Sequence, residues 1–335
     1  MNFGRTLQYP LARVPGKQQQ QPMLEDWRSL LVACQRKPSR RHVHELRVAT
    51  LRLQARLDKR FEWPEADFRA GQAARHWNKA AGKLRDDLSA VRDIDVYRGK
   101  LSLLRGTLAT PEGYTPRSSR ASLRQIETLD GWLARERKIA AKKLISDLRH
   151  RQSRLERVSG ELESAQASGY SLAPTPFSSG IFKIFADAVA EFPKLDACCL
   201  HDFRKRIKNI RYLAELFAET EPQARRQAET LRAMQGAVGE WHDWQELTRL
   251  AAGKLRKRRA QGSLIILLES ESEESLQKAL ETCRIQTAQL LSDFASDTSR
   301  MQLVGKKTPV RRLRPPKIAP MRVVPAAVLD EQRLA

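Results

Sequence analysis

The chain has 335 residues, and its 61 Lys and Arg outnumber 39 Asp and Glu, which gives a formal net charge of +22. This excess is larger than solubility requires and indicates an anionic partner, such as nucleic acid, an anionic membrane or another polyanion. No apolar run approaches the roughly 18–20 residues of a membrane span, which argues against a membrane protein. The four cysteines have no CxxC spacing, so a zinc ribbon or disulfide framework is not expected, and a cytoplasmic location fits.

The hydrophobic periodicity of the first half is helical, with no alternating strand pattern. Residues 1–23 have no continuous apolar core and are predicted to form a disordered leader, with a transit peptide as the alternative. A first helical bundle is expected over residues 24–166, with helices near 24–36, 40–61, 65–89, 94–107 and 119–165.

The second half repeats this organisation. Residues 167–180 are rich in Ser, Pro and Gly and are predicted to form a linker. A second bundle is expected over residues 181–297, with helices near 179–192, 197–219, 222–238, 243–259 and 264–297. Residues 298–335 combine cations with prolines, which is typical of a disordered basic tail. The sequence therefore predicts an all-α fold of two antiparallel bundles.

The predicted helix at residues 200–217 gathers positive charge beside its apolar face. At about 100° per residue, one face is apolar: Leu200, Phe203, Ile207, Ile210 and Ala214. A strip bordering this face is basic: His201, Arg204, Lys208 and Arg211. Like charges at these spacings repel one another by a few tenths of a kcal/mol per pair, so an anionic ligand is expected to offset the repulsion.

The same pattern occurs earlier in the chain. A shift of 157 positions aligns residues 43–57 with residues 200–214, which places His44 on His201 and Arg47 on Arg204. The first copy has fewer cations, because Leu51 and Gln54 stand where the second copy has Lys208 and Arg211. Two histidines at matching positions, each followed by Arg three residues later, are predicted to donate hydrogen bonds to phosphate oxygens. The repeat indicates two related halves.

Two aspartates lie at matching places in a second repeated segment. A shift of 150 positions aligns residues 84–101 with residues 234–251 and places Asp93 on Asp243. Both follow an expected helix end, so helix N-capping is the predicted role. The alternative is a metal-dependent phosphohydrolase, suggested by the His-Asp pairs at residues 201–202 and 242–243. Adjacent helical side chains diverge by about 100°, which weakens that alternative.

A third basic stripe follows the first histidine helix. Arg75, Lys79 and Lys83 recur every four residues, which is typical of a solvated face, but the small residues 80–82 would allow a ligand to approach closely. Phosphate loops, dinucleotide fingerprints, nucleophile elbows and metalloprotease motifs are absent from the sequence. No zinc finger, basic zipper or aromatic RNA-binding strand supports a sequence-reading nucleic-acid module.

Four segments together resemble the conserved histidine α-helical domain family (CHAD): VHELRVATLRLQARL, LRDDLSAVRDIDV, LHDFRKRIKNIRYLAELF and AMQGAVGEWHDW. The resemblance covers about residues 24–297. It implies two four-helix bundles related by a pseudo-two-fold axis, with a basic central cleft that binds inorganic polyphosphate. It also implies a location at cytoplasmic polyphosphate granules, no catalytic activity, and no cofactor or metal.

The resemblance also implies the ligands. They are His44, Arg47 and Arg52 in the first half, Lys79 and Lys83 on the next helix, and His201, Arg204, Lys208 and Arg211 in the second half. Leu51, Gln54 and Asn209 replace cations that the family usually carries. The basic tail is expected to contact polyphosphate, nucleic acid or other granule proteins. A basic nucleic-acid-binding protein is the alternative function, followed by the metal-dependent phosphohydrolase.

Overall fold

The computed structural model describes residues 20–57, 68–109, 116–167, 185–192, 195–218, 221–255 and 263–305, and within these ranges all regular structure is helical. The predicted all-α class is therefore confirmed. No helix in the described ranges is both long enough and apolar enough to cross a membrane. The chain forms two compact units, residues 1–293 and residues 294–335.

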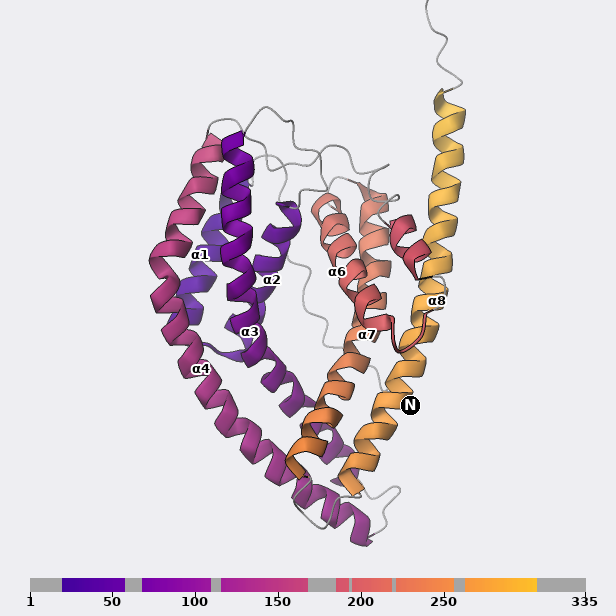
Figure 1. Ribbon diagram of the computed structural model, residues 1–335. Coiled ribbons are helices and arrows are strands. Elements are labelled where there is room, and N and C mark those ends of the chain that lie inside the picture. The colour runs from indigo at the N-terminus through magenta and orange to yellow at the C-terminus, as the bar shows by residue number, and fades with distance from the viewer. Residues whose placement is uncertain are drawn as a thin grey trace, which may run out of the picture. The chain divides into compact units, whose positions relative to one another are not determined.

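Four helices of the first half pack together. They are α1 (Gln20–Arg36), α2 (Arg40–Arg56), α3 (Phe68–Ala109) and α4 (Pro116–Ala167) (Figure 1). Their core includes Trp27 of α1 and Trp77 of α3, whose ring centroids lie 5.7 Å apart in an edge-to-face arrangement. Helix α2 begins after Ser39, whose hydroxyl accepts the backbone N–H of His42 at 3.1 Å. This N-cap satisfies one of the free amide groups at the helix start.

The second half contains α6 (Leu200–Phe217), α7 (Pro222–Leu255) and α8 (Ser263–Gly305), preceded by a short helical segment at residues 185–191. Helix α6 packs along α7. The ring of Phe203 on α6 meets that of Phe192 edge to face at a centroid distance of 5.8 Å. The apolar face predicted for α6 is confirmed, because all five of its residues are fully buried.

Helices α3 and α7 are each continuous through the positions at which the sequence predicted a break. The expected helices at 65–89 and 94–107 are one helix, α3, and those at 222–238 and 243–259 are one helix, α7. Asp93 and Asp243 therefore lie inside helices, and their predicted role as N-caps is wrong. Buried apolar residues occur before and after each aspartate, Val91 and Leu101 around Asp93 and Trp241 and Trp244 around Asp243, so the apolar stripe continues past both.

A further apolar core joins the two halves. It is built from the later part of α3, the early part of α4, the later part of α7 and the start of α8: Leu101, Leu104, Ile126, Leu129, Leu133, Trp244, Leu247, Ala251, Leu255, Leu264 and Leu268. Figure 1 shows these four helix ends converging. Helices of the two halves also pack directly, α2 against α6 and α3 against α7.

Some predicted boundaries lie outside the described residues. The linker at 167–180 lies there except for Ala167, the last residue of α4, and so do most of the leader and residues 306–335 of the tail. Helix α8 continues to Gly305, so residues 298–305 are helical although they were assigned to the tail.

Candidate functional site

The basic strips of α2 and α6 lie beside buried apolar faces, as predicted. On α2 the residues that match the buried face of α6 are all buried: Val43, Leu46, Thr50, Leu53 and Leu57. Arg47 of α2 and Arg204 of α6 are half-buried at the edge of these faces. Helix α2 contacts α6, and the charge of Arg47 acts on Lys208, so the two strips lie close to each other in the fold.

The cations converge on Lys208. Burial, followed by the positive charges of Arg47, Arg85, Arg204 and Arg211, lowers the pKa of the Lys208 ammonium to about 7. The pKa of Arg47 and that of Arg204 are also lowered, first by burial, and the charge of Arg92 contributes to both shifts. We call this group the central cation cluster: His44, Arg47, Arg85, Arg92, Arg204, Lys208 and Arg211. Its members come from α2, α3 and α6.

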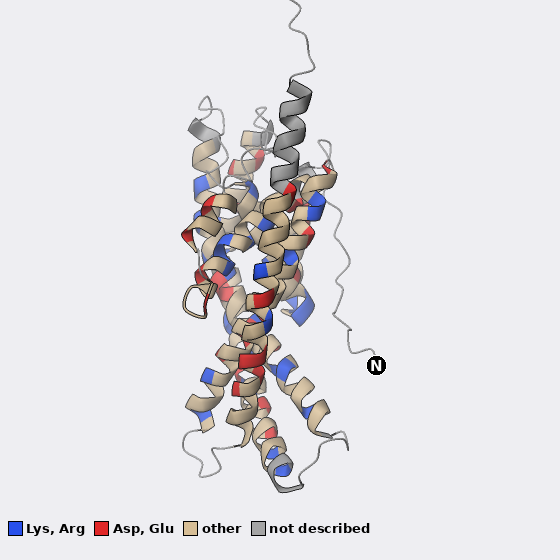
Figure 2. Cartoon of the chain, turned by 90° about the vertical axis from the view of Figure 1, so that its right-hand side faces the viewer, with Lys and Arg blue, Asp and Glu red and all other residues tan. Residues whose placement is uncertain are grey.

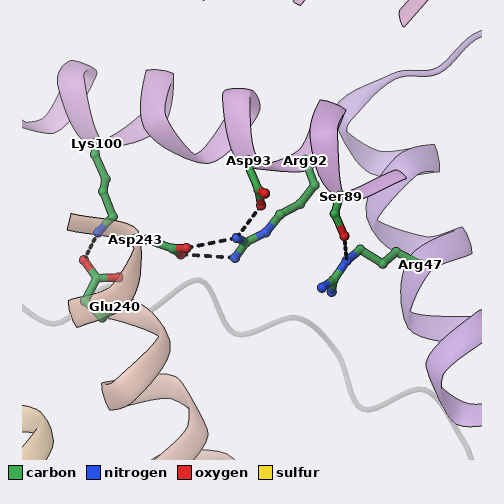
Figure 3. A network of polar contacts seen from close by, with 7 residues as sticks. All are labelled: Arg47, Ser89, Arg92, Asp93, Lys100, Glu240 and Asp243. Atoms are coloured by element: carbon green, nitrogen blue, oxygen red, sulfur yellow. Dashed lines mark hydrogen bonds and ion pairs between the residues drawn. The ribbon is translucent and has the colours of Figure 1, made fainter. Parts of the chain in front are cut away.

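Arg92 is neutralised within the cluster. Its guanidinium donates two hydrogen bonds to the carboxylate of Asp243, at 3.0 and 3.1 Å, and one to Asp93 at 3.0 Å. Figure 3 shows Arg92 reaching from α3 to Asp243 on α7, and Arg47 reaching from α2 to Ser89 on α3 at 3.2 Å. The two aspartates that the sequence assigned to helix caps thus hold an arginine that ties the halves together.

Glu215 neutralises a second part of the cluster. This buried carboxylate accepts hydrogen bonds from Arg211 and Arg232, each at 2.7 Å, and its other oxygen lies 3.7 Å from Nε of Arg52. These arginines come from α6, α7 and α2, so one carboxylate links three helices. Arg211 also lies over the ring of Tyr212, 4.1 Å from its centroid. Arg52 and Arg211, both predicted ligands, are therefore partly engaged by the protein itself.

Arg204 and Lys208 differ from Arg92 and Arg211, which are paired with carboxylates of the protein. Within the part of the chain that the structure describes, neither makes a hydrogen bond or an ion pair with another residue. Nε of Arg204 is buried without a hydrogen-bond partner. Basic and acidic positions occur along helices throughout the first unit (Figure 2), so charge alone does not mark this site. Half-buried cations without a hydrogen bond or ion pair are costly, which makes the centre of the cluster the candidate site for an anion.

The histidines lie at the edge of the cluster. Burial, then the charges of Arg92 and Arg47, lower the pKa of His44. Burial, then Lys205 and Arg204, lower the pKa of His201. The ring of His242 on α7 lies 4.9 Å from that of His201 between centroids. These shifts favour the neutral imidazoles in the free protein, and a bound anion would oppose the contribution of the neighbouring cations.

Two predicted ligands lie away from the cluster. Lys79 and Lys83 are exposed on α3. At about 100° per residue they point about 120° and 160° away from Arg85, which does belong to the cluster. Arg85, Arg92 and His242 are not among the ligands predicted from the sequence, although His242 belongs to one of the two His-Asp pairs. The repeat contained a signal for two of them, because the shift of 150 positions that aligns the aspartates also aligns Arg92 with His242.

A pocket of about 420 Å³ adjoins the cluster between α2, α3 and α6. Its lining includes Arg85 of the cluster and Tyr212, the residue that Arg211 covers. Within the described residues, no three His, Cys, Asp or Glu side chains lie together in a way that could hold a metal ion. Asp202, from one of the two His-Asp pairs, is exposed and pairs with Lys205 at 2.8 Å.

Comparison with known protein families gives a match over most of the chain. The model of the family described as "CHAD domain" matches residues 18–252. The match includes all nine ligands that the sequence resemblance implied, and it ends before α8. A comparison with curated proteins found no match at a significant level.

Proposed function

Since this chain belongs to the CHAD domain family, we propose that it binds inorganic polyphosphate through the central cation cluster and catalyses no reaction on it. The observation that carries the proposal is the pair Arg204 and Lys208, two half-buried cations without a hydrogen bond or ion pair in the described part of the chain. Polyphosphate supplies what they lack, a flexible series of anionic oxygens. The protein is proposed to act in the cytoplasm, at polyphosphate granules.

The arrangement of the cluster fits a chain-like ligand. Arg47 approaches from α2, Arg85 from α3, and Arg204 and Lys208 from α6, so successive phosphates would meet donors from different helices. Arginine offers a planar fork that matches phosphate oxygens, and lysine offers a point charge. Charge-assisted hydrogen bonds of this kind contribute about 1.5–3 kcal/mol each.

The proposal includes the two-fold relation between halves. The corresponding helices α2 and α6 pack on each other, and so do α3 and α7, which supports the proposal of a pseudo-two-fold axis through the cluster. The basic cleft would then lie on this axis. The two sides are unequal, because Leu51 and Gln54 of α2 stand where α6 has Lys208 and Arg211. The α6 side is therefore proposed to contribute most of the binding energy.

A competition experiment tests the proposal. Calorimetry at physiological salt should show tight binding of long-chain polyphosphate, and duplex DNA or RNA of equal total charge should compete poorly. Nucleic acids that bind as well as polyphosphate would favour the alternative, a general nucleic-acid-binding protein. Incubation of polyphosphate with Mg²⁺, Mn²⁺ or Fe²⁺ should release no phosphate, and release that EDTA abolishes would instead indicate a phosphohydrolase.

The proposal predicts a pH dependence that originates at Lys208. Its pKa of about 7 in the free protein must rise when phosphate binds, because the anion favours the ammonium form. The contribution of Lys208 to the affinity should therefore be constant below about pH 7 and fall as pH rises above 7, with proton uptake on binding near pH 8. Calorimetry in buffers of different ionisation enthalpy measures this uptake. Lys208→Arg, which stays charged, should bind without the uptake, and an uptake that persists would contradict the assignment.

A further inference from the structure

Helix α7 brings a histidine to the edge of the central cation cluster. His201 and Arg204 lie about one turn apart on α6, and Gly239 and His242 lie about one turn apart on α7, which packs along α6. The rings of His201 and His242 are 4.9 Å apart between centroids. A Cβ atom at Gly239 would lie 3.8 Å from Nε and 3.9 Å from Nη2 of Arg204. The two pairs are therefore in register, and His242 lies beside two predicted phosphate ligands.

The basic strip of α6 leads to this pair of histidines. Lys208 follows Arg204 by four residues, so the helical period places both on one side of α6, and His201 continues the strip by a further turn. A polyphosphate chain that contacts Lys208 and Arg204 and continues along the strip would therefore meet the two imidazoles next. Gly239 has no side chain that could separate the Arg204 guanidinium from α7.

The two imidazoles have no partner in the protein. Within the part of the chain that the structure describes, neither His201 nor His242 makes a hydrogen bond or an ion pair. Nδ1 of His242 is buried without a hydrogen bond, so the half-buried ring can present only Nε2 to a ligand. Once protonated, Nε2 is a charged donor of the kind that phosphate oxygens accept.

The acids near the two rings are already paired. Charges from α6 and α7 act on the rings: Arg204, Lys205, Asp202, Asp243 and Glu246. Each acid has a cation of its own: Asp202 pairs with Lys205 at 2.8 Å, Asp243 with Arg92 at 3.0 Å and Glu246 with Arg249 at 2.7 Å. Burial, then the charge of Arg204, lowers the pKa of His242. The free protein therefore favours the neutral ring, and a bound phosphate would raise this pKa.

We propose that His242 is a further polyphosphate ligand, which as the charged imidazolium binds a phosphate together with His201 and Arg204 where α6 meets α7. The inference rests on the proposed function, because this subsite extends the central cation cluster. It assigns the second half a ligand that the first half lacks. The repeat aligns His242 with Arg92, but Arg92 is already bonded to two aspartates of the protein.

Calorimetry with long-chain polyphosphate at about pH 6 and about pH 8.5 tests the inference. Near pH 6 Lys208 is largely charged before binding, so proton uptake there reports on groups with a lower pKa. We expect wild-type protein to take up protons on binding at pH 6. His242→Gln keeps a neutral N–H donor but cannot become charged. It should reduce this uptake and weaken binding about fivefold at pH 6, with little change at pH 8.5.

His150→Gln is the matched control, because it removes an exposed imidazole from α4 and should behave as wild type. The contribution of His44 is common to all three proteins and cancels. Equal uptake at pH 6 in wild type and His242→Gln would overturn the inference. So would a loss of affinity in His242→Gln that is the same at both pH values, because it would indicate a structural role. If wild-type protein binds polyphosphate at neither pH, the proposed function itself fails.

Discussion

Replacing Arg204 and Lys208 together with Ala is expected to weaken polyphosphate binding by about a hundredfold or more. Each contributes a charged donor that the protein leaves without a hydrogen bond or ion pair in the described residues, and two lost contacts of about 1.5–3 kcal/mol correspond to a loss of this size. The slope of log affinity against log salt should also flatten by about 0.7 per lost contact, by analogy with single-stranded nucleic acid. Arg211 is left in place because it is bonded to Glu215.

The same helix provides a matched control. Lys205→Ala with Arg206→Ala also removes two positive charges from α6, but both residues are exposed and pair with Asp202 and Glu191. This control should change affinity by only a few-fold, through long-range electrostatics. Equal losses for the two double variants would mean that net charge, not the cluster, determines binding. Helix content by circular dichroism should be the same in both variants.

Glu215→Gln is expected to lower the free energy of unfolding by about 3 kcal/mol, because removal of one partner leaves buried charge uncompensated. The carboxylate accepts hydrogen bonds from Arg211 and Arg232 and lies 3.7 Å from Nε of Arg52, so its loss leaves three arginines near one another. Saturating polyphosphate should restore much of this stability, since it supplies the missing anion. The variant should also bind polyphosphate more tightly than wild type, because a competing carboxylate is gone.

Denaturant unfolding with and without polyphosphate measures both effects. Glu191→Gln serves as the control, since its carboxylate pairs with Arg206 at the surface and should contribute at most about 1 kcal/mol. If Glu215→Gln is destabilised but polyphosphate neither restores its stability nor binds it more tightly, Glu215 holds the three helices together without belonging to the anion site.

The family match indicates which part of the molecule would carry the proposed function. It covers residues 18–252, which include α1 to α7 almost entirely and every member of the central cation cluster. Helix α8 lies beyond the match, yet Leu264 and Leu268 complete the apolar core that joins α3, α4 and α7. We therefore expect α8 to support the fold, and the cluster to be a property of the matched region.

The local features of this protein could be predicted from its sequence alone. The apolar faces of α2 and α6, the basic strips beside them and the all-α class follow from a period of 3.6 residues, which a helix imposes on any chain. Arg204 and Lys208 could be selected for the same reason, because their distance along the helix from the buried Phe203 and Ile207 fixes the side on which they point. The internal repeat then indicated that two such helices belong together.

The pairing of the charges depends on contacts between helices and could not be predicted from the sequence. Arg92 and Asp243 are separated by 151 positions, and no local sequence pattern predicts that an arginine of α3 forms an ion pair with an aspartate of α7. The same holds for Glu215, which is indistinguishable in sequence from an exposed helical glutamate until α2 and α7 bring Arg52 and Arg232 to it. Lys79 and Lys83 have a regular spacing, but the packing of α3 leaves them exposed and turns Arg85 toward Lys208. The helical period determines which residues share a face of a helix. The packing of the helices determines whether that face contacts another helix, an opposite charge or solvent.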